Sequence, residues 1–286
     1  MSIEYWYMLP VSILISTLAM ASGIGGATFF SPLFMLAQGL PPSVAIGTGL
    51  ITEVFGFASG VSAYARKRLI DYKLSSSLLM VTIPMAVLGS YLSGIINPNI
   101  LKLILGVGLI LIAISFFRIP NPEVVQYLDD AIRKDYGGEK AKRCIVTSEG
   151  KKICYTVCNR LEGSLIAGLG GLFVGMVSTG LGEMDEFFLM KRCRVPSRIS
   201  IASSVFIVAC TVLAASIVHF IRFSRMGGDT FSTVLNIIIF TIPGVIIGGQ
   251  LGPRISSKIP QRVMVISLGV IFIIVAVITL LEAALK

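Results

Sequence analysis

Charged side chains are scarce in this sequence. Only 14% of its 286 residues are Asp, Glu, Lys or Arg, whereas a soluble domain carries about a quarter. Hydrophobic residues make up 55%, and the mean hydropathy is +0.88. Apolar runs of about 20 residues recur, and each is long enough to cross a bilayer core of about 30 Å. The composition excludes an ordinary soluble domain and predicts a multi-pass protein of the cell membrane.

Cysteine and histidine are also scarce. The sequence holds five Cys and one His, so we expect neither a disulfide framework nor a metal ion or other cofactor. The net charge is +9, but the basic residues lie in short loops between apolar runs, where they set membrane orientation. Nucleic acid is therefore not an expected partner. Residues Met1–Glu4 lack the positive flank of a cleaved signal peptide, and we expect the first apolar segment to be retained.

The apolar runs are of two kinds. Two of them, residues 5–38 and 161–190, are too long for one crossing and too short for two, and each contains a glycine-rich break. A break in hydrocarbon is tolerated only where it is buried in protein or lines a wet cavity, because every backbone polar group must be paired. The uninterrupted runs predict helices at residues 43–64, 74–95, 100–117, 198–220, 231–251 and 262–281.

Short motifs recur in the two halves of the chain. The matched pieces are Ser22-Gly23-Ile24-Gly25 with Thr179-Gly180-Leu181-Gly182, and Thr82-Ile83-Pro84 with Thr241-Ile242-Pro243. Gly89 and Gly248 follow the two prolines at equal spacing. An internal duplication is therefore predicted, with a first membrane repeat at residues 1–117 and a second at residues 162–286.

Residues 118–161, between the two repeats, are rich in charge and predict a polar cytoplasmic insert. Within it, residues 144–157 predict a small β-hairpin with a turn at Glu149-Gly150. Residues 122–135 predict an amphipathic surface helix.

The charged loops distinguish two topologies. If each glycine-broken block crosses the membrane once, the basic loops fall on both sides. If each block is a re-entrant hairpin, the basic loops share one face, which the positive-inside rule predicts to be cytoplasmic. We favour the second: an all-α polytopic membrane protein with two inverted repeats, each a glycine-broken re-entrant helical hairpin plus three transmembrane helices. An odd number of crossings inverts the second repeat, which suits alternating access.

The two breaks are the candidate binding site. A re-entrant hairpin leaves unpaired N–H groups at the start of its second arm, and helix N-termini bind anions. Glycine also lets a ligand approach the backbone closely. The alternative is that these glycines only permit close helix packing. The predicted substrate-binding residues are Ser22, Gly23, Gly25, Gly26, Ala27, Thr28, Thr48, Thr179, Gly180, Gly182 and Ser203.

These motifs resemble those of the sulfite exporter TauE/SafE family of membrane permeases. The resemblance covers both membrane halves. It implies transport of small sulfur-containing or organic anions, such as sulfite or sulfoacetate, usually outward. It rests on Gly23-Ile24-Gly25-Gly26, its second copy Gly180-Leu181-Gly182, and the following pieces Pro42-Ser43 and Pro196-Ser197.

The second break departs from the family pattern, since it carries Glu183, Asp185 and Glu186 where further glycines are usual. Carboxylates at membrane depth are costly and suggest function. We interpret Glu183 or Asp185 as a proton- or cation-coupling group, with capping of the second arm as the alternative. Glu53 is the third coupling candidate, with a structural role equally favoured. His219 is interpreted as an interfacial histidine rather than a pH sensor.

The sequence therefore predicts a secondary transporter, not an enzyme, whose partners are a small anionic substrate and the lipid bilayer. Its transport is expected to be outward and proton- or ion-coupled. A cation-coupled or cation permease using Glu53, Glu183 and Asp185 is the first rival.

The second rival is a membrane sulfur-relay protein that uses the cysteines of the insert, Cys144, Cys154 and Cys158. These cysteines are otherwise interpreted as incidental thiols. A zinc or cluster site is a further alternative, but a fourth ligand is not evident.

Overall fold

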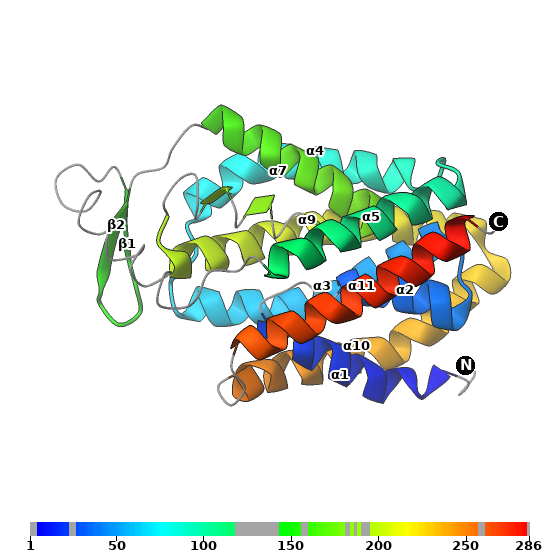
Figure 1. Cartoon of the computed structure of the whole chain (residues 1–286). Helices are drawn as coiled ribbons and strands as arrows, with labels where there is room; N and C mark the ends of the chain where they lie inside the picture. Colours follow the sequence, from blue (N-terminus) through cyan, green and yellow to red (C-terminus); the bar gives the residue numbers. More distant parts are fainter. Residues whose placement is uncertain are drawn as a thin grey trace.

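The computed structural model describes most of the chain as helix, with one small hairpin (Figure 1). The described residues are 5–22, 27–117, 143–155, 160–180, 184–185, 188–189, 195–256 and 261–284. The helices are α1 (Met8–Ser22), α2 (Ala27–Gln38), α3 (Pro42–Arg66), α4 (Tyr72–Leu92), α5 (Pro98–Phe117), α7 (Arg160–Val177), α9 (Ser197–Met226), α10 (Gly228–Ser256) and α11 (Gln261–Ala284). The strands are β1 (Arg143–Val146) and β2 (Lys152–Tyr155).

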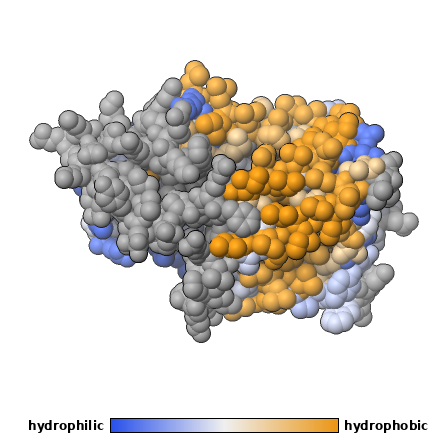
Figure 2. Space-filling view, in the orientation of Figure 1, coloured by the Kyte–Doolittle hydropathy of each residue, from blue (hydrophilic) through white to orange (hydrophobic). Residues whose placement is uncertain are grey.

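Five helices among the described residues are long and apolar enough to cross a membrane, namely those covering Pro42–Arg66, Tyr72–Leu92, Arg198–Met226, Thr230–Leu251 and Ile266–Ala284. Three shorter apolar helices accompany them. Figure 2 shows a broad hydrophobic surface over the helical body, with hydrophilic residues toward its margins. The chain is therefore an all-α polytopic membrane protein, as the sequence predicts.

The helix boundaries follow local chemistry. Pro42 begins α3, where proline fits because the first turn needs no intrahelical N–H partner. Asp71 caps α4, since its Oδ1 accepts hydrogen bonds from the N–H groups of Lys73 and Leu74 at 3.0 and 2.9 Å. The first apolar block is divided as expected into two helices, with the break at residues 23–26 lying outside the described residues.

Helix α4 packs along α7, and small residues allow the two backbones to approach closely. A Cβ at Gly89 of α4 would clash with the Leu172 carbonyl oxygen and lie 3.0 Å from the Met176 nitrogen.

Helix α10 packs along α1 in an equivalent way (Figure 1). A Cβ at Gly248 of α10 would lie 2.5 Å from the Ile13 carbonyl oxygen and 2.9 Å from the Thr17 nitrogen. Gly89 and Gly248, which the sequence motifs pair, therefore occupy corresponding packing positions.

Two buried threonine pairs join the central helices. Thr52 of α3 lies 2.9 Å from Thr241 of α10, measured between the hydroxyl oxygens. Thr82 of α4 lies 2.9 Å from Thr211 of α9. Each pair joins a helix of one half to a helix of the other.

The connections define two ends of the bundle. At one, here called the hairpin end, the Ser148 N–H of the β-hairpin donates to the Lys67 carbonyl after α3. The Asp71 N–H donates there to Ser203 Oγ, near the start of α9. At the far end, Arg222 near the end of α9 donates to the Gly94 carbonyl after α4. Helices α3 and α9, which pack against each other, thus run in opposite directions.

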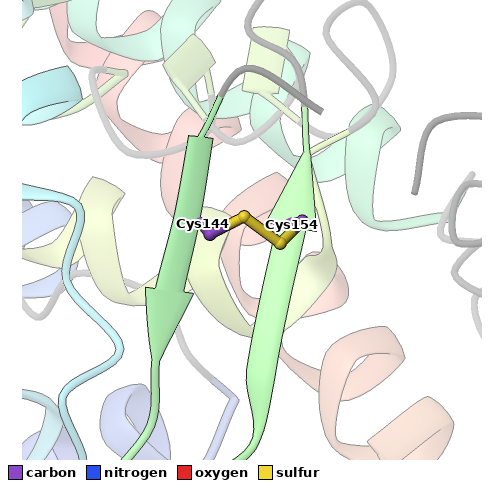
Figure 3. The surroundings of a disulfide bond; sticks show 2 residues. All are labelled: Cys144 and Cys154. Carbon is purple, nitrogen blue, oxygen red and sulfur yellow. A yellow bond between two sulfur atoms is a disulfide. The ribbon is translucent and has the colours of Figure 1, made fainter. Parts of the chain in front are cut away.

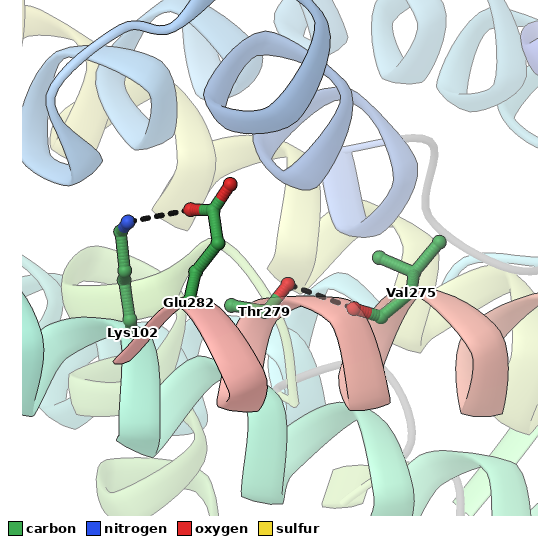
Figure 4. A network of polar contacts seen from close by, with 4 residues as sticks. All are labelled: Lys102, Val275, Thr279 and Glu282. Carbon is green, nitrogen blue, oxygen red and sulfur yellow. Dashed lines mark hydrogen bonds and ion pairs between the residues drawn. The ribbon is translucent and has the colours of Figure 1, made fainter. Parts of the chain in front are cut away.

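Helices α5 and α11 pack side by side and are joined by an ion pair (Figure 4). The Nζ of Lys102, in the first turns of α5, lies 2.6 Å from Glu282 Oε2, near the end of α11. The Thr279 hydroxyl, one turn before Glu282, donates to the Val275 carbonyl of its own helix at 2.8 Å.

The two strands begin one residue before the predicted hairpin range of 144–157 and otherwise lie within it, and they pair antiparallel with Cys144 opposite Cys154. These two cysteines form a disulfide (Figure 3). The interpretation of both as incidental thiols is therefore wrong, because the turn register places them directly across from each other. Cys158 and the expected helix at residues 122–135 lie outside the described residues.

Candidate functional site

The first break lies between α1, which ends at Ser22, and α2, which begins at Ala27. The predicted site residues Gly23, Gly25 and Gly26 lie outside the described residues. The first N–H groups of α2 have no acceptor within the helix, as at any helix N-terminus. These N–H groups at the start of α2 therefore need a polar partner from outside the helix.

The second break begins where α7 ends at Val177. Ser178 has a φ of 61° and Gly180 a φ of 106°, so the chain leaves the helix through left-handed conformations. A side chain at Gly180 would be strained there, which explains the glycine. The predicted residues Gly182 and Glu183 lie outside the described residues.

The structure brings residues beside the two breaks together. The Thr28 hydroxyl, at the start of α2, donates to Thr179 Oγ1 at 3.2 Å. Ser31, one turn further along α2, lies 2.6 Å from Ser178, measured between the hydroxyl oxygens. All four side chains are buried. We refer to Thr28, Ser31, Ser178 and Thr179 as the hydroxyl cluster, and it joins residues that are far apart in sequence.

Glycines of neighbouring helices make room for the hydroxyl cluster. A Cβ at Gly49 of α3 would lie 2.6 Å from Ser31 Oγ and 3.3 Å from the Ser31 nitrogen. A Cβ at Gly108 of α5 would lie 3.9 Å from Thr179 Cγ2. Helices α2, α3, α5 and the end of α7 therefore meet at this point.

Two predicted site residues make other contacts. The Thr48 hydroxyl is buried on α3 and donates to the Val44 carbonyl of its own helix at 2.8 Å. The Ser203 hydroxyl accepts a hydrogen bond from the Asp71 N–H at the hairpin end of the bundle.

Two of the acidic coupling candidates, Asp185 and Glu53, are buried in the protein. Asp185, which follows the second break, is fully buried, and neither of its carboxylate oxygens has a hydrogen-bond partner among the described residues. A buried carboxylate without a partner is costly, and an ionisable residue inside a membrane protein is by default a functional-site candidate. Glu53 is buried on α3, one turn beyond Gly49.

His219 is buried among α3, α7 and α9 near the far end of the bundle. It is fully buried, and its Nε2 lies 3.3 Å from the Gly175 carbonyl oxygen of α7. A Cβ at Gly47 of α3 would lie 2.8 Å from the His219 Cβ. The sequence predicts that this helix ends at residue 220, whereas α9 continues to Met226.

An apolar cavity of about 240 Å³ reaches the hydroxyl cluster at Thr28. Its other walls come from α1, α2 and α11 and include Leu18, Phe29, Phe272 and Val275. Thr28 contributes the polar group of this lining, so the cavity suits an apolar occupant better than a hydrated anion.

Sequence reasoning missed Ser178 and the two threonine pairs. Ser178 directly precedes the Thr179-Gly180 motif, and that adjacency was the available signal. Thr82 and Thr241 lie in the repeated Thr-Ile-Pro motifs, but nothing in the sequence identifies Thr52 and Thr211 as their partners.

The apolar helical bundle, with two interrupted segments meeting at a buried polar cluster, defines a multi-pass membrane protein of the permease class. A family model described as "Sulfite exporter TauE/SafE" matches residues 8–279. The chain belongs to this family, as its motifs predict.

Curated relatives are similar over nearly the whole chain. The probable membrane transporter protein YunE of Bacillus subtilis is 25% identical over 279 residues, covering 94% of each chain. The probable membrane transporter protein YjnA of the same organism is 26% identical over 263 residues, covering 89% of this chain and 92% of its own. No solved structure matches the chain significantly.

Proposed function

We propose that the protein is a secondary transporter of small sulfur-containing or organic anions, sulfite-like or sulfoacetate-like, and that it works by export rather than by enzymatic catalysis. The observation that carries the proposal is the hydroxyl cluster, in which residues beside the first break contact residues beside the second. Paired discontinuous helices in corresponding positions are the usual form of a transporter binding site. The family description and the relatives' names support the same class.

An inverted duplication is part of the proposal. The α4–α7 contact at Gly89 and the α10–α1 contact at Gly248 are related by one constant difference in residue number, added for residues of the first half and subtracted for residues of the second. The partner atoms also correspond, since each glycine lies against a carbonyl oxygen and an amide nitrogen of the other helix. The same shift converts Thr52 into Thr211 and Thr82 into Thr241, so each threonine pair maps onto the other. The opposite directions of α3 and α9 support inversion of the second repeat. Two such halves can exchange roles between outward-facing and inward-facing states.

The chemistry of the hydroxyl cluster suits an anion. Hydroxyl groups can donate hydrogen bonds to an oxyanion, and the N-terminus of α2 adds partial positive charge. In this structure Thr28 pairs with Thr179 and Ser31 pairs with Ser178. Substrate binding would replace these contacts with hydrogen bonds to the substrate. The paired hydroxyls therefore correspond to a closed site without substrate.

A transport assay with matched variants tests the proposal. Purified protein is reconstituted into liposomes and the flux of labelled sulfite is measured for Thr179→Val and for Thr279→Val. Both threonines are buried, but Thr279 bonds only within α11 in the described contacts. We expect about a tenfold loss of flux for Thr179→Val, from one lost buried hydrogen bond, and less than about a twofold change for Thr279→Val. Unchanged flux in folded Thr179→Val would reject the site.

The unpartnered carboxylate of Asp185 also favours a second candidate, a cation permease or cation-coupled carrier. The substitution Asp185→Asn separates the two. For a proton-coupled anion carrier, sulfite flux persists in the variant but no longer responds to a pH gradient. For a cation permease, the variant loses cation flux, and sulfite does not compete with the cation in the unsubstituted protein.

A further inference from the structure

The β-hairpin has two chemically different faces. Side chains alternate along each strand, so residues two apart share a face. On one face, Ile145, Ile153 and Tyr155 pack against the hydrophobic core of the bundle, and Tyr155 is fully buried. On the other face lie the disulfide sulfurs of Cys144 and Cys154 (Figure 3). The Cys144 side is exposed and the Cys154 side is half-buried.

Positive charge lies on this outer face and near the turn of the hairpin. Lys152 is exposed and lies two residues before Cys154 on the same strand, hence on the disulfide's own face. Exposed Arg66, Lys67 and Arg68 lie at the adjoining α3–α4 connection, which the hairpin contacts through the Ser148 N–H. A nearby cation favours both the approach of an anionic nucleophile and the departure of a thiolate.

The inner face is tied to the transport helices. The Tyr155 hydroxyl donates to Asp71 Oδ2 at 2.5 Å. Asp71 caps α4 through its Oδ1, and its N–H donates to Ser203 of α9. The hairpin therefore holds the capping residue that organises the hairpin end of α4 and its contact with α9.

From these contacts we infer that the Cys144–Cys154 disulfide is a modification site for anionic sulfur nucleophiles, and that its opening loosens the Tyr155–Asp71 link. Sulfite attacks one cysteine sulfur with its lone pair, the S–S bond breaks, and the other cysteine leaves as a thiolate. The products are one S-sulfonated cysteine and one thiolate, with no external oxidant or reductant. A small thiolate acts by the same displacement and leaves a mixed disulfide.

The location favours reactivity over a purely structural cross-link. The positive-inside rule predicts the basic hairpin end to be cytoplasmic. Disulfides on that side of the membrane are mostly transient or redox-sensing. The choice of sulfite as nucleophile rests on the proposed function, whereas the reactivity of the disulfide does not, and it is measured without transport.

Peptide mass spectrometry on the purified full-length protein tests the inference. The protein is incubated in separate arms with sulfite and with a small thiol, and free thiols are trapped by alkylation. We expect one SO₃ adduct per chain, on Cys144 or Cys154, in the sulfite arm, and a mixed disulfide or dithiol in the thiol arm. Opening by the thiol alone would assign the site to thiols and overturn the sulfite assignment. Recovery of two free thiols from untreated protein, or no opening in either arm, would overturn the site.

Two matched variants probe the charge argument. Lys152→Gln removes the ammonium on the disulfide's face, and Lys151→Gln removes the neighbouring one, which lies just before β2. We expect opening by sulfite to slow about threefold in the first variant and to stay unchanged in the second. Equal rates in both would contradict the role of Lys152.

Hydrogen exchange measures the coupling to α4. Opening the disulfide should increase amide exchange at Lys73 and Leu74, the two N–H groups that Asp71 caps. Tyr155→Phe should raise the same exchange rates before opening and leave no further increase afterwards. Unaltered exchange on opening in the unsubstituted protein would show that the hairpin and the α4 cap are independent, against the inference.

Discussion

The two side chains of the Lys102–Glu282 ion pair differ in their exposure to solvent. The Lys102 side chain is 11% exposed and the Glu282 side chain 41% exposed. Water can solvate Glu282 if its partner is removed, but it reaches Lys102 poorly. The cost of breaking the pair therefore depends on which partner is lost, since an uncompensated buried charge is the expensive product.

We expect Glu282→Gln to destabilise the protein more than Lys102→Met. The first variant leaves the lysine with a neutral partner at a buried position, at a cost of about 1–2 kcal/mol. The second leaves a half-exposed carboxylate in contact with water, and its cost should be less than about 1 kcal/mol. Thermal unfolding in detergent measures the two shifts. A larger loss for Lys102→Met would mean that packing of the lysine stem outweighs its charge.

At the residue scale, the sequence identifies the breaks but not the side chains that meet across them. Glycine inside an apolar run is a local signal, and Thr28 and Thr179 stand beside such glycines. The Ser31–Ser178 contact depends on the register between α2 and the end of α7, which packing determines. The Cys144–Cys154 disulfide also depends on register: a two-residue turn at Glu149-Gly150 would set Cys144 opposite Tyr155, whereas the observed pairing sets it opposite Cys154.

At the element scale, close helix contacts depend on single glycines. A Cβ at Gly89 would meet backbone atoms of α7, which cannot rotate away as a side chain can. Among the described residues, a Cβ at Gly60 of α3 would meet only Val205 Cγ1, at an ordinary contact distance of 3.7 Å. These two glycines therefore separate a packing requirement from the general effect of glycine in a helix.

We expect Gly89→Ala to destabilise the protein by about 2 kcal/mol, because it forces α4 and α7 apart. Gly248→Ala should have a similar cost through α10 and α1. Gly60→Ala is the control and should stabilise slightly, since alanine is the better helix former. Thermal unfolding of the three variants in one detergent provides the comparison. An unchanged unfolding temperature for Gly89→Ala would show that α4 and α7 can accommodate a Cβ at this position, against the prediction.

The helix boundaries illustrate why elements are only partly predictable. The apolar runs locate the helices to within a few residues, because hydrophobicity decides which segments enter the bilayer. The ends respond to individual contacts instead. Helix α9 continues past the expected residue 220 to Met226. In this extension, Arg222 donates a hydrogen bond to the Gly94 carbonyl of the α4–α5 connection.

On the scale of the whole molecule, the two ends of the bundle should face opposite sides of the membrane. The hairpin end carries Arg66, Lys67 and Arg68 together with the β-hairpin, and the far end carries the α4–α5 and α9–α10 connections. The positive-inside rule predicts that the hairpin end is cytoplasmic. This orientation also decides on which side the disulfide and the openings of the proposed transport path lie.

Cysteine labelling tests this arrangement in intact cells. In a background with the five native cysteines replaced by serine, single cysteines are introduced as Lys151→Cys in the hairpin and Met226→Cys at the end of α9, both exposed positions. A membrane-impermeant maleimide should label Met226→Cys in intact cells and Lys151→Cys only after permeabilisation. The reverse result would invert the orientation but keep the two ends on opposite sides. Labelling of both from outside would contradict the opposed directions of α3 and α9, and with them the inverted repeat on which alternating access depends.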